Sequence, residues 1–341
     1  MSRNYFITGG AGFIGSNYVK RLLERGERVT IYDNLSRAGA TRNLAWLQDK
    51  FGETAFQLTI GDVRDATLLA TSSRAADVII HLAAQVAVTT SVINPREDFE
   101  INAGGTFNVL EAARLNERKP VILYASTNKV YGGMEDVQVV EDNMRWRYAD
   151  LPLGCPETQP LDFHSPYGCS KGTGDQYVRD YARIYGLPTV VLRQSCIYGP
   201  RQFGVEDQGW VAWMIIAAVT GCPLTIYGDG KQIRDVLHVD DLLDAYDAAI
   251  AKIDKVRGQV YNLGGGPENT MSIWTEFGPL LEKLLGKPVP VRRGDWRPGD
   301  QKVFVADIRK AERELSWEPK VRVQEGVARL FEWVKENKDL F

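Results

Sequence analysis

Two residues that can perform acid-base chemistry, Tyr167 and Lys171, lie four positions apart. On a helix this spacing places both side chains on one face. A phenol has a pKa near ~10 and is a weak base at neutral pH, but a neighbouring ammonium group and a cofactor cation would favour the phenolate and lower that pKa. The pair therefore predicts a base that removes the proton of a hydroxyl group. The alternative is an ordinary polar pair at the start of a helix, which is the usual meaning of this spacing on its own.

The first fifteen residues of the chain favour the catalytic interpretation. A buried strand is predicted over residues 4–7, a glycine turn follows, and a helical pattern then runs as far as residue 23. Glycine permits positive φ and a close backbone approach, so the N–H groups and the positive dipole at the helix start can receive a pyrophosphate. The residues of this turn that are predicted to bind a dinucleotide cofactor are Gly9, Gly12, Phe13, Ile14 and Gly15.

An acidic residue, Asp33, ends the second predicted strand, which spans residues 29–32. It lies at the distance from the glycine turn at which a carboxylate binds the adenosine ribose hydroxyls, so the predicted cofactor is NAD. Arg37 follows closely and could instead bind the 2′-phosphate of NADP, which stays the alternative. Asn34 and Ser36 of the same turn are also predicted to contact the cofactor.

Short β-branched runs alternate with helical patterns as far as about residue 195, at residues 4–7, 29–32, 55–60, 78–82, 121–125 and 189–193. This alternation predicts an α/β protein with a doubly wound, parallel sheet of the Rossmann type. Ligands bind beyond the carboxyl ends of such strands. The third and fourth strand ends therefore add further predicted cofactor-binding residues, namely Asp62, Val63, Leu82, Ala83, Ala84 and Gln85. Asp62 could bind the adenine amino group or equally serve as a helix N-cap.

The alternation of strand and helix patterns ends after residue 193, where loops rich in Gly and Pro begin. We expect a second, smaller α/β lobe there that binds substrate. Residues 232–262 look like a return to the first domain, with a helix capped by Asp240 and Asp241. The predicted domains are therefore residues 1–193 with 232–262 for NAD, and residues 194–231 with 263–341 for the substrate.

Composition excludes several other classes of protein. The chain has 341 residues, 44% of them hydrophobic, and a net charge of −3, without a basic run interleaved with aromatics, so a small-molecule ligand is expected rather than nucleic acid. No apolar run approaches ~18 residues and no leader is evident, so we expect no membrane partner and a cytoplasmic location. The four cysteines and three histidines show no metal-ligand spacing, so no metal site is predicted.

Six motifs together resemble the extended short-chain dehydrogenase/reductases that modify nucleotide sugars, and the resemblance covers nearly the whole chain. The motifs are residues 8–15, 81–84, 130–132, 167–171, 234–241 and 262–265. Residues 33–37, 126–132, 162–171, 207–210 and 303–308 are most similar to the CDP-tyvelose 2-epimerases of that family, also called CDP-paratose 2-epimerases. This resemblance implies a tightly held NAD that is reduced and reoxidised within one turnover, a CDP-3,6-dideoxyhexose substrate, and a homo-oligomer, usually a tetramer but alternatively a dimer.

The resemblance also implies the roles of individual residues. Tyr167 would remove the proton of the C2 hydroxyl to give a 2-keto sugar, Lys171 would hold the nicotinamide ribose and lower the pKa of the tyrosine, and Thr127 would hydrogen-bond the reacting oxygen. The predicted substrate-binding residues are Thr127, Asn128, Gln202, Arg234 and Arg297. For the two arginines, surface salt bridges are an equally valid expectation.

Two positions after Thr127 help to choose the reaction. Sugar-nucleotide 4,6-dehydratases of the same fold carry an Asp-Glu pair there, whereas this chain has Asn128 and Lys129. An amide cannot act as an acid and a solvated lysine is a poor base, so dehydration is disfavoured. Cys196 replaces the Asn of a family signature that often contacts the substrate phosphates. A UDP-hexose 4-epimerase stays the alternative enzyme, and the intact Thr127, Tyr167 and Lys171 argue against a catalytically silent NAD sensor.

Overall fold

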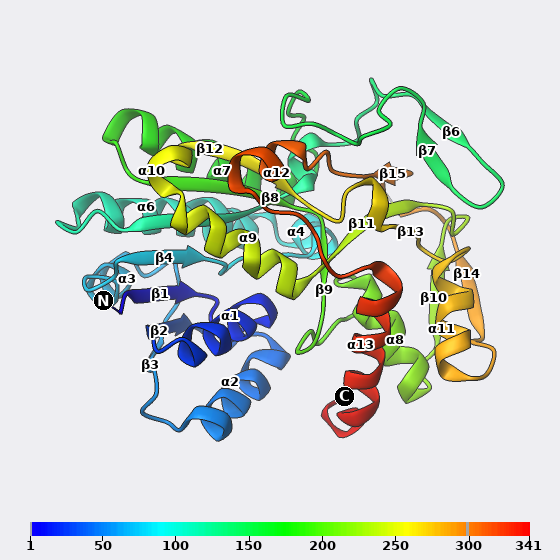
Figure 1. The fold of residues 1–341 in the computed structure, drawn as a ribbon, viewed down its shortest axis with the longest axis horizontal. Helices are drawn as coiled ribbons and strands as arrows, with labels where there is room; N and C mark the ends of the chain where they lie inside the picture. The colour runs from blue at the N-terminus through cyan, green and yellow to red at the C-terminus, as the bar shows by residue number, and fades with distance from the viewer. Residues whose placement is uncertain (1, 298–299) are drawn as a thin grey trace. The chain divides into compact units, whose positions relative to one another are not determined.

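The computed structural model describes residues 2–297 and 300–341, which fold as two compact units (Figure 1). The first unit contains Met1–Thr127, Ser165–Arg193 and Tyr246–Tyr261. The second unit contains Asn128–His164, Gln194–Ala245 and Asn262–Phe341. These units differ from the boundaries expected from the sequence in residues 128–164 and 232–245, which fold with the second unit.

A seven-stranded sheet in the order β12-β8-β5-β4-β1-β2-β3 organises the first unit. Its pairings of β1 with β2 and β4, of β2 with β3, and of β4 with β5 are parallel. The strands are β1 (Asn4–Thr8), β2 (Arg28–Asp33), β3 (Gln57–Ile60), β4 (Val78–His81), β5 (Val121–Thr127), β8 (Thr189–Gln194) and β12 (Gln259–Leu263). The predicted doubly wound α/β fold is confirmed, and β12 is a strand that the sequence pattern did not reveal.

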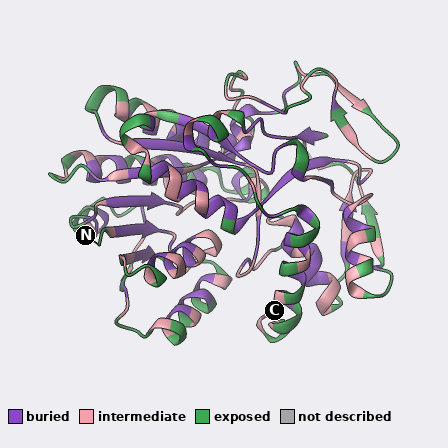
Figure 2. Ribbon diagram, viewed as in Figure 1, coloured by how far each residue is buried: buried purple, intermediate pink, exposed green. Residues whose placement is uncertain are grey.

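Burial along the strands agrees with a sheet that is covered by helices on both faces. Every residue of β4 and β8 is buried, as expected for parallel strands inside such a sheet. The edge strand β3 is mostly exposed. Figure 2 shows the same contrast between buried strands and helices whose outer faces are exposed.

The helices of the first unit follow from amphipathic patterns. In α1 (Phe13–Glu24), the side chains of Tyr18, Val19 and Leu22 recur at helical spacing and are buried. The further helices that begin in this unit are α2 (Ala38–Phe51), α3 (Ala66–Ser72), α4 (Val88–Ile93), α5 (Pro95–Phe99), α6 (Gly105–Leu115), α7 (Ser165–Tyr185) and α10 (Ile253–Val256). The helix α9 (Val239–Ala251) contributes residues to both units.

A π-helical segment, η1 (Glu100–Gly104), joins α5 directly to α6. The backbone stays right-handed helical at both junctions, so α5, η1 and α6 form one continuous run. Single π-helical turns of this kind occur frequently at functional sites. Asp98 and Asn102 are four positions apart in this run, and each is only 1% exposed.

The second unit contains a four-stranded sheet in which β11 (Ile233–His238) is the central strand. It pairs in parallel with β9 (Cys196–Tyr198) and β15 (Val303–Phe304), and antiparallel with β13 (Thr270–Ser272). The sequence had suggested that this segment returns to the first domain. That prediction is wrong for β11, because all of its pairings are with strands of the second unit.

The rest of the second unit packs around a separate apolar core. Two smaller sheets pair β10 (Leu224–Tyr227) with β14 (Val291–Gly294) and β6 (Val139–Glu141) with β7 (Trp146–Tyr148). The helices are α8 (Trp210–Thr220), α11 (Phe277–Leu285), α12 (Arg309–Leu315) and α13 (Val323–Glu336). The core includes Ile215, Phe277, Leu281, Val327 and Leu330. No helix among the described residues combines the length and the apolar composition needed to cross a bilayer.

Candidate active site

The turn between β1 and α1 has the backbone geometry of an anion cradle. Gly9 has φ of +71°, and a Cβ atom there would lie 2.8 Å from the backbone nitrogen of Ala83. A Cβ atom at Gly15 would overlap the carbonyl oxygen of Gly9. The helix α1 begins after Gly12 without a side-chain cap. The first N–H groups of the helix are therefore available to a pyrophosphate.

Asp33, at the end of β2, fixes this turn from the neighbouring strand. Its Oδ2 accepts a hydrogen bond from the N–H of Ala11 at 3.0 Å, and its Oδ1 accepts one from Leu35 at 2.8 Å. Burial raises the pKa of the Asp33 carboxyl, and these two backbone hydrogen bonds partly offset the rise. Each carboxylate oxygen can accept a further hydrogen bond, so Asp33 can also receive ribose hydroxyls.

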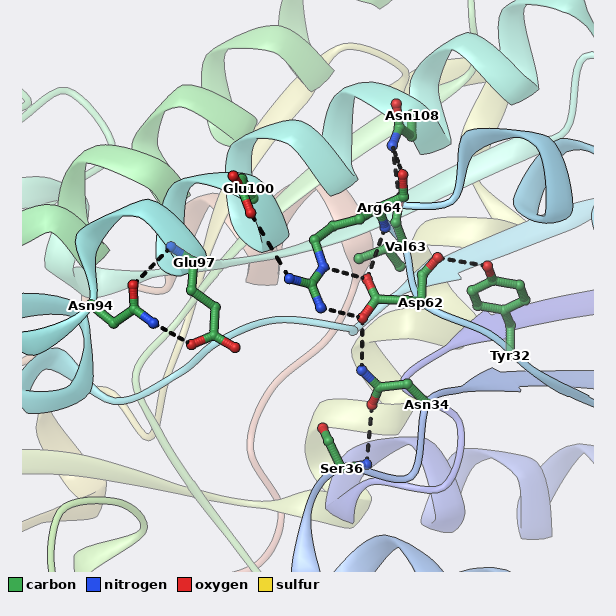
Figure 3. Close-up of polar contacts among 10 residues, drawn as sticks. All are labelled: Tyr32, Asn34, Ser36, Asp62, Val63, Arg64, Asn94, Glu97, Glu100 and Asn108. Atoms are coloured by element: carbon green, nitrogen blue, oxygen red, sulfur yellow. Dashed lines mark hydrogen bonds and ion pairs between the residues drawn. The ribbon is translucent and has the colours of Figure 1, made fainter.

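Asp62 makes a network with its neighbours (Figure 3). Its Oδ1 accepts hydrogen bonds from the backbone N–H and the Nε of Arg64, and its Oδ2 accepts from the Arg64 guanidinium and the Asn34 amide. The Arg64 hydrogen bonds hold the pKa of Asp62 at about 2, against the effect of burial. The N-cap of α3 is Asp65, not Asp62. An adenine amino group would have to displace one of these donors, so the adenine role of Asp62 stays a prediction.

The loop after β4 is also held close to the glycine turn. The N–H groups of Leu82 and Ala83 both approach the hydroxyl oxygen of Thr8 at 3.2 Å. The same hydroxyl meets Nδ1 of His81 at 2.7 Å. The structure thus brings together the predicted cofactor residues of four strand ends in the first unit.

Tyr167 lies in the first turn of α7 and is 9% exposed. Burial raises the pKa of its phenol to about 12, Asp98 adds to the rise, and a hydrogen bond with the Thr127 side chain and the charge of Arg37 oppose it. In the protein without a cofactor, desolvation of the phenolate therefore outweighs the groups that favour it, and the lowered tyrosine pKa, which was expected from an ammonium group together with a cofactor cation, stays a prediction. The electrostatic influence of Arg37 also shows that its guanidinium is near Tyr167.

Lys171 is 5% exposed, and its side chain reaches the strand β5. Its Nζ donates to the carbonyl oxygen of Ala125 at 2.6 Å and lies 4.3 Å from the centre of the Tyr124 ring. Burial lowers the pKa of Lys171 to about 7, while Asp175 and then Asp98 act in the opposite direction. The structure therefore brings Thr127, Tyr167 and Lys171 together, as predicted. The pKa of Tyr167 is raised and that of Lys171 is lowered.

The predicted substrate residues lie in the second unit, apart from Thr127. Arg234 is 7% exposed and donates to Asp300 at 2.6 Å. Arg297 forms a partly exposed ion pair with Asp207 at 3.3 Å, so the salt-bridge alternative describes this arginine better. Of the segment 297–300, Pro298 and Gly299 lie outside the described residues.

Gln202 and Asn128 are each 9% exposed. Gln202 donates through Nε2 to the Ile197 carbonyl at 3.3 Å. Its Oε1 is buried without a hydrogen-bond partner among the described residues. Asn128 begins the short 3-10 turn Asn128–Tyr131. An unpaired buried acceptor is costly, so Gln202 is suited to receive a donor from a ligand.

Lys129 is not the solvated lysine that the sequence suggested. Its side chain is largely enclosed, and its Nζ approaches Oε1 of Gln301 at 3.5 Å. Burial lowers the pKa of Lys129, the charge of Arg234 lowers it further, and Asp300 opposes this. The repulsion from Arg234 exceeds the attraction to Asp300, so an anion would be stabilised beside these two cations. No group of His, Cys, Asp or Glu in the described chain is arranged to hold a metal ion.

Three polar residues beside the catalytic pair were missed by sequence reasoning. Asp98, Asn102 and Ser170 are all buried and hydrogen-bonded to one another. Ser170 could have been found from its place inside the Tyr-Lys segment. Asp98 stands in a polar run of residues 95–100, where a solvated helix face is the usual expectation, so no signal in the sequence identifies it.

A family profile described as GDP-mannose 4,6 dehydratase matches residues 6–330. The chain belongs to this family.

The relatives are nucleotide-sugar enzymes, and the match to each extends over nearly its full length. The chain is 47% identical over 335 residues to a CDP-paratose 2-epimerase from Salmonella typhi, covering 96% of this chain and 98% of that protein. It resembles the structure of a UDP-glucose 4-epimerase from Thermotoga maritima with UDP-glucose, with a TM-score of 0.84, 30% identity, and 98% and 99% of the two chains covered. A UDP-glucose 4-epimerase from Thermus thermophilus in complex with NAD gives a TM-score of 0.80 at 30% identity, covering 97% and 98%.

Proposed function

We propose that this protein is an NAD-dependent epimerase that inverts C2 of a CDP-linked 3,6-dideoxyhexose, of the CDP-paratose to CDP-tyvelose type, through transient oxidation to a 2-keto sugar. The observation that carries the proposal is the buried Tyr167, within hydrogen-bonding reach of Thr127 and one helical turn before Lys171. The 47% identity to a CDP-paratose 2-epimerase supports the choice of substrate.

The residues of the first unit fit NAD. The pyrophosphate would lie at the start of α1, and the tight backbone packing at Gly9 and Gly15, where a Cβ would strike Ala83 and Gly9, keeps this turn in place. Asp33 would bind the adenosine ribose, since its carboxylate already faces the glycine turn. Lys171 would hold the nicotinamide ribose. When bound, NAD would supply the acceptor and donor of the hydride and place a positive charge near the phenol.

The proton chemistry belongs to Tyr167. Its phenol oxygen would take the proton of the substrate C2 hydroxyl and later return it. A pKa of about 12 in the protein alone means that the phenol is protonated at rest, so the added cations of the bound state must favour the phenolate. Thr127 would hydrogen-bond the same oxygen as its charge changes.

The second unit would bind the nucleotide. Arg234 and Lys129 together favour an anion, and we assign the substrate diphosphate to them, with Arg297 as a further contact. Asn128 would contact the sugar, and Gln202 a hydrogen-bond donor of the substrate. Assembly of the chain as a homo-oligomer remains part of the proposal.

A UDP-hexose 4-epimerase is the second candidate, favoured by the similarity to the Thermotoga structure. Both reactions use the same tyrosine on different hydroxyls. A panel of CDP-, UDP-, GDP- and dTDP-linked sugars, read by NMR for the carbon that inverts, separates them. Inversion at C2 of a CDP-dideoxyhexose supports the proposal, whereas inversion at C4 of a UDP-hexose with C2 untouched would replace it.

A further inference from the structure

Asp98 is a buried carboxylate that has no part in the chemistry described so far. Its Oδ2 accepts a hydrogen bond from the Ser170 hydroxyl at 2.5 Å. Its Oδ1 accepts from the side-chain amides of Gln85 and Asn102, each at 3.1 Å. All three donors are uncharged. Because a buried charge costs free energy unless it is compensated, the retention of an ionisable group here needs a physical reason.

The hydrogen bonds of Asp98 join three separate segments of the first unit. Gln85 follows β4, Asn102 lies in the π-helical segment, and Ser170 lies in α7. Asn102 also donates to Ser170 and to the Gln85 carbonyl, each at 3.0 Å, and accepts from the Gln85 N–H at 2.9 Å. The network therefore fixes the turn of α7 that carries Tyr167 and Lys171 against the loop that is proposed to line the cofactor.

Asp98 also acts on the charge of Lys171. Burial lowers the pKa of Lys171 to about 7, and the opposing groups are Asp175 and Asp98. Asp175 forms a two-pronged ion pair with Arg193, with both N–O distances at 2.9 Å. Asp175 has the larger effect of the two on Lys171, but its charge is paired with a guanidinium, whereas the donors to Asp98 carry no charge. Removal of Asp98 therefore changes the net charge around Lys171 directly.

Two other titratable groups near Lys171, His81 and Tyr124, are neutral and therefore do not change the net charge around it. Burial and Lys171 together lower the pKa of His81 to about 3, so the imidazole is neutral. Burial raises the pKa of Tyr124 well above its usual value, so that phenol is neutral too. The titratable groups that interact electrostatically with Lys171 are Asp175 from α7, Asp98 from α5 and His81 from β4, and its Nζ also lies 4.3 Å from the centre of the Tyr124 ring of β5.

We propose that Asp98 is a positioning residue, whose buried carboxylate holds Lys171 as an ammonium ion and holds Ser170 so that Tyr167 and Lys171 keep their places on α7. The inference rests on the proposed function for the need to keep Lys171 charged. The proposal concerns the protonation of Lys171 in the protein alone, so it can be tested without substrate or turnover.

The direct test is the titration of Lys171 by NMR of lysine labelled with ¹⁵N at Nζ and ¹³C at Cε, in the full-length protein and in Asp98→Asn. Asparagine keeps an oxygen for Gln85 and Asn102 and offers an amide N–H to the Ser170 oxygen, so the fold can be retained. We expect the Lys171 midpoint to move to lower pH in Asp98→Asn. An unchanged midpoint in the folded variant would overturn the proposal.

Glu97→Gln is the matched control, because it removes one negative charge from the adjacent, partly exposed position of α5. We expect no change of the Lys171 midpoint in this variant. An equal shift in Glu97→Gln and Asp98→Asn would contradict a specific role for Asp98.

A reciprocal measurement covers the case in which Asp98→Asn does not fold. Burial raises the pKa of Asp98, and the Ser170 hydrogen bond and the charge of Lys171 oppose this rise, so linkage requires that loss of Lys171 raises the pKa of Asp98 further. In Lys171→Met labelled with ¹³C at the aspartate carboxyls, the Asp98 signal should titrate at higher pH than in the parent. Equal Asp98 midpoints in the two proteins would refute the coupling, whatever the enzyme's activity proves to be.

Discussion

The two units differ in the charged groups that surround their lysines, Lys171 in the first and Lys129 in the second. In the first, burial drives both catalytic groups toward neutrality, with the pKa of Tyr167 at about 12 and that of Lys171 at about 7. In the second, burial also lowers the pKa of Lys129, the charge of Arg234 lowers it further, and Asp300 opposes this. In the first region, two carboxylates therefore favour the ammonium form of the lysine, whereas in the second a guanidinium disfavours it unless an anion binds beside both groups.

This difference separates the work of the two regions. A group whose protonation responds to the bound state can exchange a proton with a hydroxyl. A guanidinium and a lysine beside one carboxylate favour the binding of an anion. We therefore expect substitutions in the first region to reduce the rate constant and substitutions in the second to reduce affinity for the nucleotide.

The largest effect is expected for Tyr167→Phe, which removes the proton carrier. Turnover should fall by at least ~10²-fold, the usual scale of a lost acid-base group, with the substrate KM and the melting temperature nearly unchanged. Steady-state kinetics and thermal unfolding measure this. Tyr177→Phe, at a tyrosine that is 46% exposed, is the control. Near-normal turnover of Tyr167→Phe would remove this residue from the mechanism.

Arg234→Lys should show the reverse pattern. The charge is retained but the planar fork is lost, which costs about one charge-assisted hydrogen bond of ~1.5–3 kcal/mol. At about 1.4 kcal/mol per tenfold, the substrate KM should rise roughly 10- to 100-fold while kcat changes little. The comparison between the two regions fails if this variant instead loses kcat at constant KM.

A smaller, pH-dependent effect is expected on the stability of Lys171→Met without cofactor. The pKa of Lys171 is about 7 in the folded chain and ~10.4 when unfolded, so the folded state binds fewer protons between these values. The lysine's contribution to stability therefore rises with pH across this window. Below pH ~7, the free energy of unfolding of Lys171→Met should exceed that of the parent by the largest margin. Above pH ~7, this margin should shrink by about 1.4 kcal/mol per pH unit.

Denaturant unfolding of both proteins across the same pH range measures this difference. Lys20→Met, at an exposed lysine, serves as the control. A gap between Lys171→Met and the parent that is independent of pH would mean that Lys171 keeps its ordinary titration in the fold.

What could be predicted from the sequence depended on how locally each feature is encoded. The glycine turn and the Tyr167–Lys171 pair are each encoded by residues that are close together in the sequence. The structure places Asp33 against the glycine turn, and Tyr167 and Lys171 together in α7, as expected. The burial of Lys129 and of Asp98 depends on segments far away in the chain, including Gln301 and Ser170. The raised pKa of Tyr167 in the protein without a cofactor could not be predicted, because desolvation is a property of the packed interior, which residue spacing does not report.

The pairing of β11 was missed for a related reason. Its residues read as a buried strand followed by a helix, which is the pattern of the first unit. Its partners β9, β13 and β15 are short strands of two or three residues, too short to stand out in a sequence. A strand's own pattern indicates that it is buried but not in which sheet it pairs.

The central claim is that C2 is inverted by oxidation and re-reduction within the enzyme, and conversion of CDP-paratose or CDP-tyvelose in heavy water tests it most directly. The hydrogen that leaves C2 should return to C2 without exchange with solvent, so NMR of the product should find little deuterium there. Substantial deuterium at C2 would show that a carbon-bound proton is removed to solvent and would contradict the account.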